Sequence, residues 1–327
     1  MSRMGSRHER PMDDGVFGRG GSRRDTVSDM EFLAPGNMQE LGDALRLMTP
    51  DSRFLAGGTD VVRRLNEGSL TPDRIVDLSG VPELRFVRQE AGRLHIGSAT
   101  TLALIQREAS ISRFAGCLAE AAATVGSRQI RNVATIGGSV ANASPCGDIL
   151  PALLVLDSVA TVLDPAGVTR QLPVTALLGA PGVRQLKCGE VITGFEFPAL
   201  GPDEHSTFTR VSSRSTFSVA RLSMAIVVTC AAPGGRLRNV RVALGAVGTA
   251  AFRDDVLQRF LEGRRADSAT SALFAEECTA AIRRAIPDRP SLPYKQSAVR
   301  GLACDALAGL GVFLSPSGDV DEPQSGA

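Results

Sequence analysis

Apolar and polar positions follow a helical period in some segments of this chain and alternate as in strands in others. In MQELGDALRLM, one helical face carries Leu41, Ala44, Leu45 and Met48. Asn37 precedes this segment and Glu40 follows three residues later, which is the spacing of a capping box. The runs RFL, RIVDL and RLHIGS predict strands, while TLALIQRE, with Thr100 or Thr101 as its cap, and RFAGCLAEAAATVG predict helices. The first part of the chain is therefore predicted to mix helices and strands.

The pattern changes after Ser158, where short β-rich pieces such as SVATVLD, VTRQLPV, EVITGFEF and STFTRVSS follow one another. Two longer apolar strands, joined across Pro233, Gly234 and Gly235, predict a hairpin. Three helical stretches follow, the last running from Tyr294 to about Leu310. We expect an α+β protein with a first domain over residues 30–205 and a separate, smaller α+β domain over residues 206–312. Residues 1–29 and 313–327 are predicted to be disordered.

Composition excludes several kinds of function. Lysine and arginine number 36 against 35 acidic residues, so no overall positive field attracts nucleic acid. No run of eighteen apolar residues and no signal-peptide core occurs, which predicts a cytoplasmic protein without membrane insertion. The six cysteines are scattered without a CxxC pair and only three histidines accompany them, so we expect no metal site.

Two glycine-rich turns carry the candidate chemistry. The first is RFLAGGTDVVRRL around Gly57 and Gly58, and the second is NVATIGGSVANASPCGDILPALLVLD around Gly137 and Gly138. Each leads from an apolar stretch into a possible helix start, where backbone amides can face a phosphate. The two turns therefore predict one ligand with two phosphates, such as a dinucleotide. Neither turn fits the Rossmann fingerprint or the phosphate loop of NTPases.

Five segments together resemble the FAD-binding subunit of molybdenum hydroxylases, the xanthine dehydrogenase and carbon monoxide dehydrogenase family. They are AGGTD, QIRNVATIGGSVANASPCGDILPALLVLD, GEVITGFEFP, RVALGAVGTAAFR and YKQSAVRGLACDAL, and they span about residues 30–312 in the family's order. The resemblance implies an FAD held between two α+β subdomains of the vanillyl-alcohol-oxidase (PCMH) type, over about residues 30–86 and 87–205, followed by a smaller C-terminal domain. It implies no catalytic side chain and no metal ligand in this chain.

By the same resemblance, the FAD pyrophosphate lies against the backbone amides of residues 56–60 and 135–138. The implied cofactor contacts are Leu55, Ala56, Gly57, Gly58, Thr59, Asp60, Val125, Thr135, Ile136, Gly137, Gly138, Asn142, Asp148, Ile192 and Arg210. Asp148 also stands where a cap of the helix ILPALLVLD would stand, and the two roles are compatible. Ile192 fits a core position nearly as well as a cofactor contact, and Asn142 fits a simple turn.

The chain departs from the family pattern at a few positions. Cys146 replaces the usual alanine of the SPAGD segment, which puts a thiol near the expected cofactor. In TRVSSRSTFSVA, where the family has a lysine and an aspartate, Arg210 is the nearest cation and the aspartate is missing. Arg128 and Arg131 flank the second turn, either to offset cofactor charge or as solvated side chains. His95 lies in a strand pattern and is expected to be structural.

The function that the resemblance implies is electron transfer. In the family, a molybdopterin-binding large subunit oxidises the substrate, a small [2Fe–2S] subunit relays electrons, and the FAD of this chain would deliver them to NAD, oxygen or a quinone. The resemblance also implies that these subunits assemble as a dimer of heterotrimers. One alternative is a self-contained flavin oxidase of the vanillyl-alcohol-oxidase type, although little chain is left for its substrate domain. Another is a scaffold subunit that binds no FAD.

Overall fold

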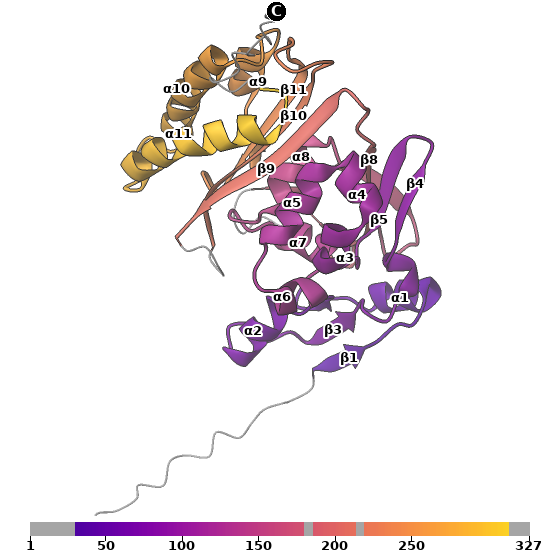
Figure 1. Ribbon diagram of the computed structural model, residues 1–327. Helices are drawn as coiled ribbons and strands as arrows, with labels where there is room; N and C mark the ends of the chain where they lie inside the picture. The colour runs from indigo at the N-terminus through magenta and orange to yellow at the C-terminus, as the bar shows by residue number, and fades with distance from the viewer. Residues whose placement is uncertain (1–29, 180–185, 214–218, 314–327) are drawn as a thin grey trace, which may run out of the picture.

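The computed structural model describes residues 30–179, 186–213 and 219–313. Three β-sheets with their own helices are stacked along the molecule in chain order, from the indigo N-terminal part to the yellow C-terminal helix (Figure 1). The tails predicted to be disordered lie outside the described residues, except for Phe313, which packs against the C-terminal core.

The N-terminal part is a small parallel sheet with two helices. Its strands, in the order β1-β3-β2, are β1 (Glu31–Leu33), β2 (Arg53–Leu55) and β3 (Arg74–Asp77), and its helices are α1 (Met38–Arg46) and α2 (Val61–Asn66). The predicted cap of α1 is confirmed, since Asn37 Oδ1 accepts a hydrogen bond of 2.9 Å from the Glu40 amide. The Glu40 carboxylate in turn accepts one of 2.8 Å from the Gly36 amide. One unpaired amide of the first turn is thereby satisfied, and the reciprocal bond to Glu40 comes from the residue before the cap rather than from the cap itself.

The middle part combines six short helices with an antiparallel sheet of order β4-β5-β8-β6-β7. The helices are α3 (Leu102–Arg107), α4 (Ala109–Phe114), α5 (Gly116–Thr124), α6 (Arg128–Val133), α7 (Ile136–Asn142) and α8 (Ile149–Val155). The strands are β4 (Val87–Glu90), β5 (Arg93–Gly97), β6 (Val159–Leu163), β7 (Thr169–Pro173) and β8 (Val191–Pro198). Of the two predicted candidates for the cap of α3, Thr100 and Thr101, the structure has Thr101, whose hydroxyl accepts from the Leu104 amide. The predicted helix over residues 113–126 is in part wrong, because Ala115 has φ −158° and separates α4 from α5.

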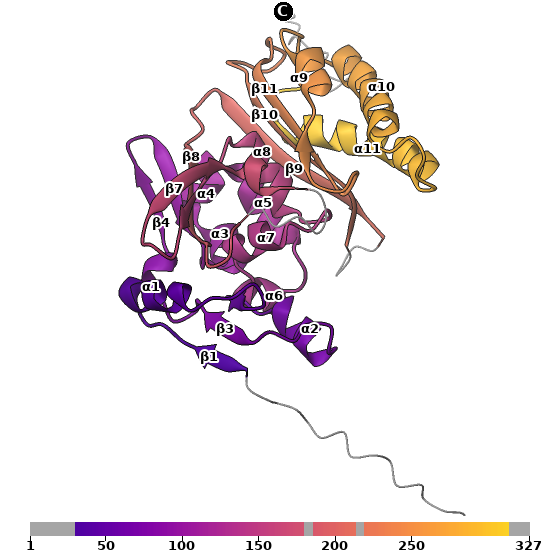
Figure 2. The same ribbon diagram turned by 180° about the vertical axis from the view of Figure 1, so that it is seen from behind.

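The C-terminal part is an antiparallel sheet with helices on both faces. Its strands, in the order β12-β11-β10-β9, are β9 (Glu204–Ser212), β10 (Ala220–Thr229), β11 (Arg238–Gly245) and β12 (Phe252–Arg253). Three helices, α9 (Asp255–Leu261), α10 (Ser268–Ala285) and α11 (Leu292–Gly309), cover one face, while α5 and α8 of the middle part lie against the other (Figure 2). The predicted hairpin is confirmed as the antiparallel pair β10 and β11.

Burial on both faces explains why β10 is an almost continuous apolar run. Met224 and Ile226 belong to the C-terminal core, whereas Ala225 and Val227 belong to the core of the middle part. Successive side chains of a strand point to opposite faces, so a sheet between two helical layers needs apolar residues at both parities. The same packing buries every residue of α8.

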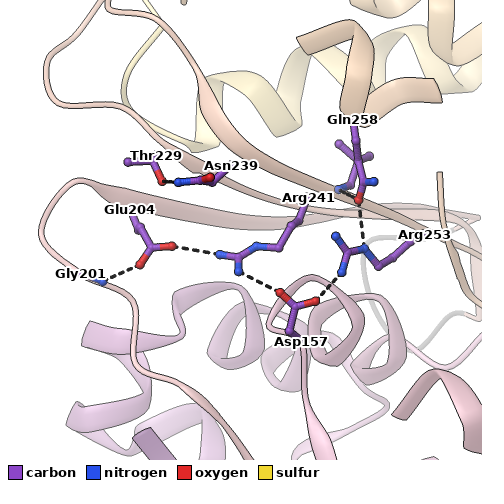
Figure 3. A network of polar contacts seen from close by, with 9 residues as sticks. Asp157, Gly201, Glu204, Thr229, Asn239, Arg241, Arg253 and Gln258 are labelled. Carbon is purple, nitrogen blue, oxygen red and sulfur yellow. Dashed lines mark hydrogen bonds and ion pairs between the residues drawn. The ribbon is translucent and has the colours of Figure 1, made fainter. Parts of the chain in front are cut away.

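A network of charged side chains closes the joint between the middle and C-terminal parts (Figure 3). Asp157, just beyond α8, accepts hydrogen bonds from Arg241 of β11, at 3.0 Å, and from Arg253 of β12. Arg241 also donates to Glu204 at 3.0 Å. One helix of the middle part is therefore tied at its C-terminal end to three strands of the C-terminal sheet.

Candidate functional site

A cleft of about 1190 Å³ opens where the N-terminal, middle and C-terminal parts meet. Sites for drug-sized ligands are usually about 300–1,000 Å³, so this cleft is large enough for a ligand of dinucleotide size. The residues of the sequence prediction that line it are Ala56, Gly57, Gly58, Thr59, Asp60, Val125, Thr135, Gly137, Gly138, Asn142, Asp148, Ile192 and Arg210. Leu55 and Ile136 do not line it. Ile136 is fully buried in the core of the middle part, and Leu55 packs beneath Gly58.

The first glycine turn presents unpaired donors to this cleft. Among the described residues, no acceptor bonds to the backbone amides of Gly57, Gly58, Thr59 or Asp60. Gly58 has φ +69°, a conformation that favours glycine. Gly57 is pressed against the end of α6, so closely that a Cβ would overlap the carbonyl oxygen of Val133. The turn therefore joins the N-terminal and middle parts and leaves a group of amides available for a ligand.

The second glycine turn is built differently from the prediction. The amides of Ile136 and Gly137 donate to the carbonyls of Thr100 (3.1 Å) and Ser98 (2.8 Å). The Gly138 amide donates to Thr135 Oγ1 at 3.1 Å, which caps α7. These three donors are thus already used within the protein. Gly137 has another reason to be glycine, because a Cβ would lie 2.7 Å from the Ser98 carbonyl oxygen.

Asp148 is held by side chains rather than by the helix it precedes. The predicted cap is wrong, because Asp148 has helical φ and ψ angles (−65°, −29°) and makes no side-chain cap bond to α8. Its Oδ2 instead accepts hydrogen bonds from Arg210 at 2.6 Å and from Thr124 at 3.0 Å. Burial raises the pKa of Asp148, and the charge of Arg210 and the Thr124 hydroxyl oppose that rise.

Two buried oxygens in the cleft wall have no partner within the described part of the chain. They are Oδ1 of Asp148 and Oγ of Ser98. Unpaired buried oxygens are uncommon, and they are found where a ligand or water completes the site. The sequence analysis did not identify Ser98, because nothing in RLHIGS marks this serine. Ser98 is buried where the segment after β5 lies against Gly137 at the start of α7.

The remaining predicted residues differ in exposure. Ile192 is 4% exposed and belongs to the core while also contributing to the cleft wall. Asn142 is exposed at the end of α7, and Ala143 after it has φ +45°, which is strained for a residue with a Cβ. Cys146 is half-buried in the wall.

Other kinds of site receive no support from residues 30–179, 186–213 and 219–313. No group of three or more histidine, cysteine or acidic side chains in these ranges is placed to hold a metal ion. His95 lies in the middle sheet, with Nδ1 3.5 Å from Glu196 Oε2, outside the cleft lining. None of the helices that the structure describes has both the length and the apolar character needed to cross a membrane.

Comparison with known proteins identifies relatives over most of the chain. Residues 28–200 match the family model described as the FAD binding domain in molybdopterin dehydrogenase. The chain is 32% identical to the nicotinate dehydrogenase FAD-subunit of Eubacterium barkeri over 59% of its own length and 67% of that protein. It is also 32% identical to the xanthine dehydrogenase FAD-binding subunit of Escherichia coli O157:H7, over 68% and 77%. Quinoline 2-oxidoreductase from Pseudomonas putida 86 has a chain of similar fold, with a TM-score of 0.78, 26% identity and coverage of 87% of this chain and 98% of that one.

Proposed function

Because this chain belongs to the family of FAD-binding domains of molybdopterin dehydrogenases, we propose that it carries electrons within a molybdenum hydroxylase complex. In this proposal the electrons come from [2Fe–2S] clusters of a small partner subunit and leave FAD for an external acceptor such as NAD or a quinone. The chain is an oxidoreductase subunit that binds FAD, as its named relatives are.

The assignment of the cofactor to this cleft rests on the free amides of the first glycine turn. A pyrophosphate is an anion that accepts several hydrogen bonds, and four neighbouring amides without acceptors suit it. Basic and acidic side chains are both present in the cleft wall, so the turn rather than net charge would select the phosphates. FAD also suits the size of the cleft and the unpaired Asp148 oxygen.

Each part of the cleft wall would then have a separate task. The amides of residues 57–60 would hold the pyrophosphate, and Asp148, oriented by Arg210, would offer its unpaired Oδ1 to the cofactor. Val125 and Ile192 supply apolar surface for the rings. FAD supplies the redox chemistry, since a flavin exchanges one or two electrons, and the protein orients and insulates it. No side chain of the cleft is required to move a proton in this scheme.

Partners, location and domain division are further parts of the proposal. We expect a molybdopterin-binding large subunit and a [2Fe–2S] small subunit, assembled as a dimer of heterotrimers. A cytoplasmic location agrees with the six cysteines, all of which are free. The boundary between a flavin domain over residues 30–205 and a C-terminal domain over residues 206–312 agrees with the start of β9 at Glu204.

Purification from the native host at low salt, with a visible spectrum and identification of co-eluting chains, tests the proposal. Flavin bands together with iron–sulfur and molybdopterin subunits would support it, and reoxidation by added NAD, quinone or oxygen would identify the acceptor. A yellow protein that elutes alone would favour the self-contained flavin oxidase. Co-eluting partners without flavin bands in the spectrum would favour the scaffold.

A further inference from the structure

We propose that Arg131 is a positioning residue for the cofactor, which shapes one wall of the cleft without being a ligand itself. The inference rests on the proposed function only in taking FAD as the occupant of the cleft. The wall in question is the loop of residues 125–127, between α5 and α6, and each of its three residues lines the cleft. Arg131 lies one helical turn beyond this loop on α6 and is absent from the lining.

Three hydrogen bonds connect the Arg131 guanidinium to its surroundings. Nη1 donates to the carbonyl oxygens of Gly126 at 3.0 Å and Val125 at 3.3 Å. Nε donates to Oε1 of Gln106 on α3 at 3.1 Å. The two carbonyls are thereby bound to a rigid, permanently charged fork, and the fork is itself oriented from a neighbouring helix.

The loop needs such support because its backbone is not held by a regular element. Gly126 has φ +49°, and the side chain of Ile130 packs so near that a Cβ on Gly126 would lie 2.9 Å from Ile130 Cγ2. Ser127 caps α6 by accepting from the Ile130 amide. The loop is therefore bonded to the first turn of α6 through Ser127. Arg131 holds the other end of the loop by its two carbonyl oxygens.

Arg128 offers a matched control on the same helix. It has the same charge and lies three residues before Arg131, yet it is exposed and its side chain makes no hydrogen bond or ion pair with any described residue. If charge near the cleft were what the cofactor required, both arginines would contribute. If the cofactor depends on the shape of the wall, Arg131 should contribute to FAD affinity and Arg128 should not.

Gln106 distinguishes positioning from a general effect on folding. Gln106 does not line the cleft, and the side-chain hydrogen bond that it makes within the described residues is the one to the Arg131 guanidinium. Removing Gln106 should therefore matter when Arg131 is present and not otherwise. A purely structural role would instead lower the melting temperature without a specific change in FAD affinity of the folded protein.

The test is FAD affinity, measured by flavin fluorescence on the full chain, co-expressed with its partner subunits where those are needed for flavin loading. We expect Arg131→Gln to raise the Kd for FAD by about tenfold or more. Arg131→Lys, which keeps the charge but has a single donor nitrogen, should restore part of the affinity. Arg128→Gln should stay within about twofold of wild type. Gln106→Ala should raise the Kd less than Arg131→Gln does and should add nothing to it in the double variant. Hydrogen exchange of the loop amides should quicken in Arg131→Gln.

Equal FAD affinities for Arg131→Gln and Arg128→Gln would overturn the role of Arg131 and leave the proposed function intact. Additive effects of Gln106→Ala and Arg131→Gln would also overturn it. If Arg131→Gln does not fold, Arg131→Lys and Gln106→Ala still decide the matter, since each retains a cation at the loop. A wild-type complex without FAD would contradict the proposed function and this inference together.

Discussion

Arg210 Nη1 lies 2.6 Å from Asp148 Oδ2, and this ion pair joins β9 of the C-terminal sheet to the start of α8 in the wall of the cofactor cleft. The two side chains are 14% and 4% exposed, so the pair is shielded from solvent. Removing one partner of a buried pair leaves the other charge buried and unpaired, which lowers the free energy of unfolding far more than losing a surface pair does. The Asp148–Arg210 pair should therefore affect both the stability of the contact between the middle and C-terminal parts and the binding of the cofactor.

We predict that Asp148→Asn destabilises the apo protein by about 3 kcal/mol, the lower end of the range for breaking a buried ion pair. FAD affinity should fall as well, because the carboxylate is a proposed cofactor ligand. Thermal unfolding and flavin titration of the same samples separate the two effects. A lower melting temperature with unchanged FAD affinity would make Asp148 structural only.

A methyl group at Gly57 should disturb the site because the turn contacts α6. In Gly57→Ala the new Cβ would overlap the Val133 carbonyl oxygen, so the first glycine turn must move and FAD retention should be lost. Gly42→Ala is the control, since Gly42 lies in α1 with nothing within 4 Å of the added Cβ. That variant should gain about 0.5–1 kcal/mol of stability and keep its flavin. Flavin content of the two purified proteins is the measurement, and full flavin in Gly57→Ala would contradict the prediction.

FAD should protect some cysteines from alkylation and not others. Half-buried Cys146 and exposed Cys188 line the cleft, whereas exposed Cys304 lies on α11 outside it. Burial raises the pKa of Cys117 to about 12, so this thiol should not react in the native protein. Mass spectrometry after iodoacetamide treatment, with and without FAD, should show slower labelling of Cys146 and Cys188 and no change at Cys304. Equal protection of all three would indicate a global change instead of occupancy of the cleft.

Glu190, in the cleft wall, should make stability depend on pH in the acidic range. Burial raises the pKa of Glu190, but the hydrogen bonds from Arg170 and the Lys187 amide outweigh it, so this pKa lies below its ordinary 4.5. A depressed carboxyl pKa stabilises the fold above the unfolded-state value and ceases to do so as the pH falls through the folded-state value. The difference in unfolding free energy between wild type and Glu190→Gln should be constant near neutral pH and shrink below about pH 4.5. A difference that grows on acidification would contradict this assignment.

The Asp157 network should stabilise the joint between the middle and C-terminal parts by an amount that depends on salt (Figure 3). Asp157 has φ +52°, which asparagine also tolerates, so Asp157→Asn removes the charge without new backbone strain. Because Asp157 is 45% exposed, we expect a loss of only about 1 kcal/mol at low salt, smaller at high salt. Chemical denaturation at two ionic strengths measures both values. A loss that does not vary with salt would argue against an electrostatic role.

The sequence alone determined the local features and the family. The capping box at Asn37 and Glu40, the hairpin at residues 233–235 and the cap at Thr101 follow from neighbouring residues, so short-range chemistry predicts them. The glycine turns and the ordered motifs around them likewise predicted the FAD-binding family that the comparison identifies.

Tertiary structure decided how the two turns are used and what Asp148 does. The turns look alike in sequence, but the Ile136 and Gly137 amides of the second donate to the carbonyls of Thr100 and Ser98, which reach them only when the segment after β5 meets the start of α7. Asp148 precedes a helix as a cap would, yet its partner Arg210 is 62 residues away on β9 of the C-terminal sheet. Hydrogen bonds of this kind depend on which distant segments meet, and burial then determines which donors and acceptors stay free for a ligand.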